Sequence, residues 1–355
     1  LPPHANRARK PMPNTISEES DESPCTKSAL ISSEFVEWSW KQFAQPVSYE
    51  TEEEAAANDV QSRVYYEREW RFLRNKRCRR DAREEQKKAL TARTDFQIFH
   101  TRCPQQPDVI AFHPFDSHLA VASKDSFGIW DWQSCVKLTW FAKATRTGTK
   151  VTSLNFINAH DVSLLMTASD DGSVRLWKHY WTHLTREANL LTAWQALADV
   201  PPATKASSTS RGLVTSWEQR SLTLAVTGDV KAVRLWDAET ELKKQDISTG
   251  ADCGATSLDT DGNGAMMVVG CGDGSVRLFD RRLPPNETRI MTWREHNNWV
   301  LGAYLPRGES TRLISGSVSG DIRIFDLRKN SSVNVIQTHT NLTALTLHPA
   351  ANILA

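Results

Sequence analysis

A glycine-rich string from Gly270 to Gly274 (GCGDG) is the first feature of the sequence that could do chemistry, because it superficially resembles a phosphate-binding loop. A phosphate loop leads into a helix whose first backbone amides bind the anion. This string leads instead into SVRLFD (275–280), whose pattern is typical of a β-strand. We therefore expect the glycines to form a hairpin turn and not an anion site.

Histidines and cysteines give little support for a metal site. His179 and His183 are four residues apart beside Trp181, but no third ligand candidate is near in sequence, and zinc sites need three or four. The six cysteines contain no CxxC pair, and we expect reduced thiols. They are Cys25, Cys78, Cys103, Cys135, Cys253 and Cys271. Serine-hydrolase, phosphate-loop, zinc-protease and kinase motifs are not found, so we expect no catalytic residue, no cofactor and no metal.

A long helix is predicted ahead of the rest of the chain. Asn58 or Asp59 is a plausible N-cap, and about thirty residues follow without Gly or Pro, up to Ala92. Its candidate docking residues share one face and are Tyr66, Trp70 and Leu73. Large side chains on one helix face need a partner surface.

The other faces of this predicted helix are strongly basic between residues 68 and 88. The cationic side chains include Arg68, Arg71, Arg74, Lys76, Arg77, Arg79, Arg80, Arg83, Lys87 and Lys88. Such a run is able to bind nucleic acid or an acidic surface. A solvated helix face is the simpler interpretation, and a nuclear-targeting signal in RNKRCRR (74–80) is a weaker one.

A repeated unit organises most of the chain. DGSVRLW (171–177) returns as DGSVRLFD (273–280), and looser copies are GIWDW (128–132), VRLWD (233–237) and IRIFD (322–326). The aromatic residue therefore recurs at 130, 177, 236, 279 and 325, at spacings of 47, 59, 43 and 46 residues. A period in the forties that ends in Trp-Asp or Phe-Asp is typical of a four-stranded WD40-type propeller blade.

The second copy shows the expected strand order. Val151 to Phe156, Leu164 to Ser169 and Ser173 to Trp177 are predicted strands, with turn residues at 170–172. In the third strand Val174 and Leu176 face one side while Arg175 and Trp177 face the other, so we expect a half-buried strand.

The fold class predicted from these repeats is mainly β, a WD40-type β-propeller preceded by a helical segment. Residues 1–33 are predicted to be a disordered linker, 34–95 a helical segment that includes a short helix over 35–43, and 96–355 an incomplete propeller. The expected blades are 109–142, a second from Val151, then 212–247, 255–293 and 300–338, and a sixth begins at Leu342. Each unit is expected to end in an outer fourth strand after its aromatic residue. The unusually long connection from Lys178 to Arg211 contains PPATKASSTS (201–210), which its composition predicts to be a flexible loop.

Structural repeat positions follow from the same comparison. The aromatic-Asp positions are Trp130, Asp131, Trp177, Trp236, Asp237, Phe279, Asp280, Phe325 and Asp326. The turn between the second and third strands carries Asp171 and Asp273 in two blades, whereas Lys124, Val230 and Ser319 stand there in the others. His296 precedes the fifth blade and is expected to tie a loop to that blade by hydrogen bonds.

Seven strings, in order along the chain, are more specific than the repeat pattern. They are EWRFLRN (69–75), FHPF (112–115), TAWQ (192–195), STGAD (248–252), GDGSVRLFDRR (272–282), REHNNWV (294–300) and GDIRIFD (320–326). Together they closely resemble the Raptor family, the regulatory-associated subunits of TOR kinase complex 1. The resemblance covers about residues 34–355. Members of that family have a caspase-like domain, a helical solenoid and a C-terminal seven-bladed propeller. The resemblance implies that this chain holds the end of the helical part and about five and a half blades.

The same resemblance implies a non-catalytic scaffold or adaptor subunit of TOR complex 1, which helps present substrates and regulators to the kinase in nutrient-responsive growth signalling. The implied partners are the TOR kinase, other subunits of that complex, substrate proteins, and small GTPases at the lysosome or vacuole. The implied location is the cytoplasm, with peripheral recruitment to those membranes. The parts of the family that bind substrate motifs lie outside the resemblance, so no substrate-binding residue is carried over.

A nucleic-acid or chromatin-associated WD40 protein that uses the basic helix is the alternative function. The charge is balanced, with 43 Lys and Arg against 42 Asp and Glu in 355 residues, which disfavours it. We therefore expect no nucleic-acid partner. No apolar run is long enough to span a bilayer, so no transmembrane segment is expected.

Overall fold

The computed structural model describes residues 58–89, 91, 97, 100–141, 148–181, 189–203, 211–307, 311–348 and 353–355. The predicted linker over 1–33 and the predicted short helix over 35–43 lie outside these residues. The chain divides into two compact units between Arg71 and Phe72, and the larger unit extends from Phe72 to Ala355. The domain boundary predicted near residue 95 stays a prediction.

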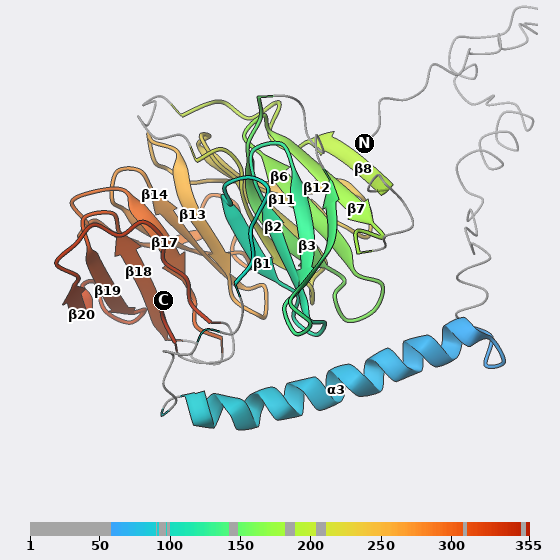
Figure 1. Cartoon of the computed structure of the whole chain (residues 1–355). Helices are drawn as coiled ribbons and strands as arrows, with labels where there is room; N and C mark the ends of the chain where they lie inside the picture. Colours follow the sequence, from blue (N-terminus) through green and yellow to red (C-terminus); the bar gives the residue numbers. More distant parts are fainter. Residues whose placement is uncertain are drawn as a thin grey trace, which may run out of the picture. The chain divides into compact units, whose positions relative to one another are not determined.

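Twenty strands in the described residues form five four-stranded antiparallel sheets, each made from consecutive strands (Figure 1). Blade one contains β1 (Val109–Phe112), β2 (His118–Ala122), β3 (Phe127–Asp131) and β4 (Val136–Phe141). Blade two contains β5 (Val151–Ile157), β6 (Leu164–Ser169), β7 (Ser173–Lys178) and β8 (Asn189–Gln195). Blade three contains β9 (Val214–Glu218), β10 (Thr223–Thr227), β11 (Ala232–Asp237) and β12 (Leu242–Ser248). Blade four contains β13 (Ala255–Thr260), β14 (Met266–Cys271), β15 (Val276–Asp280) and β16 (Arg289–Trp293). Blade five contains β17 (Val300–Tyr304), β18 (Arg312–Ser317), β19 (Asp321–Asp326) and β20 (Ser332–Gln337).

The predicted WD40 propeller blades are therefore confirmed, and so is the interpretation of the glycine-rich string. Cys271 ends β14 and Val276 begins β15, and these two strands pair antiparallel. Between them Gly274 has a φ of 79°, a left-handed conformation that glycine adopts without steric cost. No helix follows the turn, so the string lacks the helical amides of a phosphate loop.

Apolar cores lie between neighbouring blades, which corrects the prediction of half-buried strands. Val174 packs toward blade three and Trp177 toward blade one, and both are nearly inaccessible, at 0% and 5% exposure. Every residue of β15 is buried. The predicted alternation of faces was right, but both faces of blade two are covered because it lies between blades one and three.

A second correction concerns the connection from Lys178 to Arg211. It contains a regular strand, β8, which pairs with β7 and completes blade two. An outer fourth strand was expected in each unit, but it was not located within this connection. Leu190 and Leu191 remain about half exposed, so the segment shows no strong pattern of burial.

The described residues after Leu342 lie in the segment predicted to begin a sixth blade. An isolated antiparallel bridge joins Leu347 to Leu354, and backbone hydrogen bonds link Thr346 with Ala355 and His348 with Ile353. Leu345 is buried against blade five, within the same cluster as Leu301 and Ile322.

The predicted long helix is α3, Arg63–Ala89 (Figure 1). It begins later than the predicted cap at Asn58 or Asp59. Ser62 is the cap, because its Oγ accepts a hydrogen bond of 3.1 Å from the Tyr65 amide. Among the described helical residues, no stretch is both long enough and apolar enough to cross a lipid bilayer.

Candidate functional site

The recurring aromatic residues occupy one equivalent position in all five sheets. The pairing of the third and fourth strands shifts register immediately before each of them. They are Trp130, Trp177, Trp236, Phe279 and Phe325, of which all but the half-buried Trp236 are buried. The indole of Trp177 donates a hydrogen bond of 3.0 Å to Thr167 Oγ1, which fixes it against the second strand of its blade.

The aspartates that follow these aromatics cap the turn between the third and fourth strands. In each case Oδ1 accepts a hydrogen bond of 2.9–3.1 Å from the amide two residues later. The aspartates are Asp131, Asp237, Asp280 and Asp326. Asp171 and Asp273 close the preceding turn in the same way, each by accepting bonds from the amide and hydroxyl of a serine two residues later.

His296 lies in a buried hydrogen-bonded network in blade five. Its Nδ1 is 2.5 Å from Asp321 Oδ2 and its Nε2 is 2.6 Å from Ser315 Oγ. Burial lowers the pKa of His296, so its ring is neutral at pH 7. A carboxylate only accepts, so Nδ1 donates to Asp321 and Nε2 accepts from Ser315. The network joins the loop before β17 to β18 and β19.

Asp321 was missed by the sequence comparison, which placed Ser319 at the aspartate position of blade five. Blade two reads Asp171-Gly-Ser173 across this turn, whereas blade five reads Ser319-Gly-Asp321. In blade five the serine and the aspartate have exchanged positions, and a hydrogen bond still spans the glycine. Ser319 Oγ donates to Asp321 Oδ1 at 2.7 Å. Burial alone would raise the pKa of Asp321, but hydrogen bonds from Ser319 and Arg323 outweigh it and lower that pKa to about 2. The sequence signal that could have identified Asp321 is the triplet S-G-D (319–321), which is D-G-S in reverse order.

The candidate docking residues on α3 are exposed. Tyr66, Trp70 and Leu73 have 60%, 61% and 56% of their surfaces accessible. Tyr66 and Trp70 line a shallow hollow of about 450 Å³ together with Gln61, Arg63 and Glu67. A docking role for this face stays a prediction.

Polar residues of α3 make the contacts between the helix and the first two blades. Asn75 is 2% exposed and its Nδ2 donates to the backbone oxygen of His160 at 2.8 Å. Arg74 Nη1 lies 2.5 Å from Asp116 Oδ1, and the guanidinium of Arg79 lies 5.1 Å from the centre of the Phe115 ring. Sequence reasoning had treated this arginine-rich side as solvated, and nothing in the helix alone marked Asn75 as buried.

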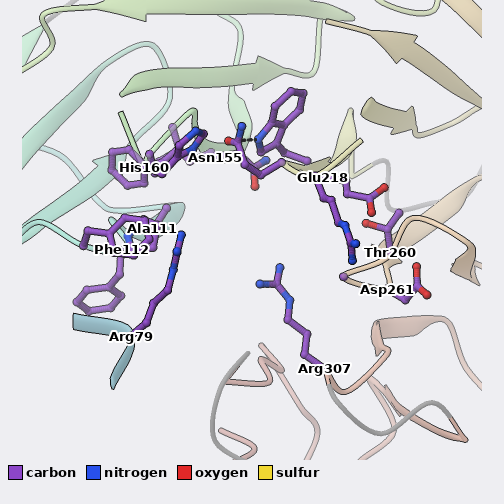
Figure 2. A pocket seen from close by; sticks show the side chains of 18 residues that line it. Arg79, Ala111, Phe112, Asn155, His160, Glu218, Thr260, Asp261 and Arg307 are labelled. Carbon is purple, nitrogen blue, oxygen red and sulfur yellow. Dashed lines mark hydrogen bonds between the residues drawn. The ribbon is translucent and has the colours of Figure 1, made fainter. Parts of the chain in front are cut away.

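The loops that join the first and second strands of the blades enclose a cavity of about 560 Å³ (Figure 2). All five described blades contribute to its lining, and α3 adds Arg79. Its walls combine apolar surface, such as Phe112 and Trp217, with charged groups. The charged lining residues are Arg79, Arg220, Arg307, Glu218 and Asp261.

Cys253, Cys271 and Asp273 are the one group in the described residues with three metal-binding atoms close together, all within 4.8 Å. The sequence did not indicate that Cys253 and Cys271 are close, because they are 18 residues apart. They are neighbours because the chain before β13 runs beside the end of β14. A hydrogen bond with Cys271 lowers the pKa of Cys253 to about 7. Three protein ligands are one short of a closed structural zinc site. Arg277 Nη2, 3.7 Å from Asp273 Oδ2, already places a positive charge there, which opposes a cation.

Comparison with known proteins agrees with this geometry. The family model for the WD domain, G-beta repeat, matches residues 141–178 and 243–280. The chain is 32% identical to the target of rapamycin complex 1 subunit KOG1 of Saccharomyces cerevisiae over 343 residues, covering 92% of this chain and 21% of that protein. It is 30% identical over 328 residues to the subunit mip1 of Schizosaccharomyces pombe, covering 92% of this chain and 24% of that protein.

A crystal structure of Chaetomium thermophilum Raptor matches with a TM-score of 0.63 and 32% identity, over 70% of this chain and 22% of that one. The chain is a homologue of the Raptor proteins. The Raptor homologue of Dictyostelium discoideum is 27% identical and covers 99% of this chain. The chain spans about a fifth to a quarter of the length of these Raptor-type relatives.

Proposed function

We propose that the chain is part of a non-catalytic scaffold or adaptor subunit of TOR complex 1, which helps present substrates and regulators to the TOR kinase. The observation that carries this is the match to subunits of that complex along more than nine tenths of the chain. The described architecture supports it, because five rigid blades display many loops, and loops on a rigid scaffold concentrate recognition.

The proposed partners are the TOR kinase, other subunits of its complex, substrate proteins, and small GTPases at the lysosome or vacuole. The protein would act in the cytoplasm and reach those membranes through its partners. We propose no chemistry for the blades. The repeat aspartates and His296 are all engaged in turns or buried structural hydrogen bonds.

Nucleic-acid binding by helix 68–88 is the second candidate. The many Lys and Arg side chains of α3 favour this function. Some of them are paired with neighbouring carboxylates, which weakens it, as in Arg77–Asp81 at 3.6 Å and Lys88–Glu85 at 2.7 Å. Phosphate contacts make affinity fall steeply with salt. Titration with random RNA at rising salt therefore separates this function from a scaffold.

The test is purification of the tagged intact protein from its own cells, followed by identification of what accompanies it. We expect the TOR kinase to co-purify in near-stoichiometric amounts and to persist after nuclease treatment. An R77Q/R80Q variant, which removes two exposed charges of α3, serves as a matched control and should retain the kinase. Absence of the kinase, with nuclease-sensitive RNA or chromatin proteins dominant and lost in this variant, would overturn the scaffold proposal.

A further inference from the structure

The lining of the cavity enclosed by the five blade loops carries more arginines than carboxylates. Arg79, Arg220 and Arg307 come from α3, the loop between β9 and β10, and the loop after β17. No ion pair joins any of the three to a described carboxylate. Arg79 lies over the Phe115 ring, and Arg220 donates to the neutral Asn263 Oδ1 at 3.0 Å.

The acidic lining of the cavity does not balance these guanidinium groups. Glu218 is 5% exposed, and its Oε2 is already bound to Arg281 at 3.1 Å and to Ser221 Oγ at 2.7 Å. Asp261 Oδ1 accepts a hydrogen bond from the Met266 amide at 3.1 Å. Among the described lining residues, Arg79, Arg220 and Arg307 therefore form no ion pair, and Asp261 is the one carboxylate without an ion pair.

The arginines and the apolar wall face the same space. Figure 2 shows Arg79 and Arg307 extending into the cavity from separate elements, with Phe112 beside Arg79. Phe112 is 66% exposed although it belongs to β1, an innermost strand. A large apolar side chain that faces an arginine-lined cavity suits a ligand with both an apolar group and anionic groups.

We infer that this cavity is a docking site for an anionic peptide segment of a partner protein, whose carboxylate or phosphate groups pair with Arg79, Arg220 and Arg307 while an apolar side chain covers Phe112. Guanidinium groups bind both anions through paired, charge-assisted hydrogen bonds. A cavity of about 560 Å³ holds a few peptide residues. Nucleic acid suits it less, because Asp261 interrupts any continuous basic track along the wall.

This site goes beyond the proposed adaptor function and does not depend on which complex the protein joins. The test measures fluorescence anisotropy of the intact protein with a labelled peptide of sequence EEFEE, with a phosphoserine version SpSpFSpSp, and with KKFKK. We expect both anionic peptides to bind and the lysine peptide to show no binding. Inorganic phosphate at equal concentration should not compete, which separates a peptide site from one for adventitious anions.

An R79Q/R220Q/R307Q variant should weaken peptide binding at least about tenfold, because charge-assisted hydrogen bonds are lost. A K137Q/K244Q/K329Q variant removes the same charge from exposed positions outside the cavity and should bind like the unaltered protein.

If the triple arginine variant loses its fold, R307Q alone, at an exposed position, provides the comparison. Equal binding by the two triple variants, no binding by the unaltered protein, or displacement of peptide by lower concentrations of polyuridine than of unlabelled peptide would each overturn the inference.

Discussion

His296 shows how one residue can decide the stability of a blade. Its neutral ring needs a donor on one side and an acceptor on the other, and Ser315 and Asp321 provide both within 2.6 Å. Because the ring is buried, water cannot replace either partner.

Replacement Asp321→Ala should therefore lower the free energy of unfolding by about 1 to 3 kcal/mol, since it leaves a buried Nδ1–H without an acceptor. Urea unfolding of the intact protein measures this. Glu239→Ala changes an exposed acid in blade three and should have almost no effect. Equal losses in the two variants would show that Asp321 is not a structural partner of His296.

Asp259 should make stability depend on pH. Burial raises its pKa to about 6, and its Oδ2 accepts the Leu305 amide at 2.9 Å. The folded state thus binds more protons than the unfolded state between about pH 4 and pH 6. The contribution of Asp259 to stability is therefore full below about pH 4 and is lost as pH rises through 6.

Replacement Asp259→Asn should remove that loss, so the variant gains stability relative to the unaltered protein as pH rises from 4.5 to 7.5. Two pKa units correspond to roughly 2 to 3 kcal/mol. The test compares the free energy of unfolding of the variant with that of the unaltered protein at each pH. This comparison is needed because burial lowers the pKa of His113, His118 and His296, so these histidines make the protein more stable as pH rises. A constant difference across this range would contradict the raised pKa.

At the scale of elements, α3 is linked to the blades through polar contacts. Asn75 is the most buried of its contact residues, and its amide donates to a backbone oxygen that belongs to the loop after β5.

Asn75→Ala should accordingly cost about 1 to 2 kcal/mol, because the His160 carbonyl loses its donor, and should speed amide hydrogen exchange along 72–89. Hydrogen exchange followed by mass spectrometry measures this directly. Arg77→Ala, at an exposed position of the same helix, is the control. Unchanged exchange in Asn75→Ala would mean that other contacts hold the helix.

At the scale of the whole molecule, the connection between β8 and β9 is a candidate contact region for partners. Replacing residues 204–210 by a short Gly-Ser linker should leave the unfolding transition unchanged while weakening binding of at least one co-purifying protein. Quantitative mass spectrometry of the purified complexes measures the second effect. A full set of partners at unchanged abundance would exclude this connection as a contact element.

The sequence was sufficient to predict the blades, because each depends on local turn chemistry and on alternation within about forty residues. It was insufficient wherever chain segments meet across a sheet or between elements. The proximity of Cys253 to Cys271, and the hydrogen bond from Asn75 to the His160 backbone, depend on pairings that no local pattern contains. The cavity arginines likewise come from three separated segments, so only the folded chain brings them to one space.

The register shift before each recurring aromatic residue also affects the free edge of every blade. β4, β8, β12, β16 and β20 end their sheets, and an unpaired strand edge can add a strand from another molecule. An extra residue in the pairing increases local twist, and charged residues such as Lys243, Lys244 and Arg289 lie on these strands. A twisted, charged edge is a poor template for intermolecular pairing. The five shifts therefore help to keep the blades from polymerising at high protein concentration.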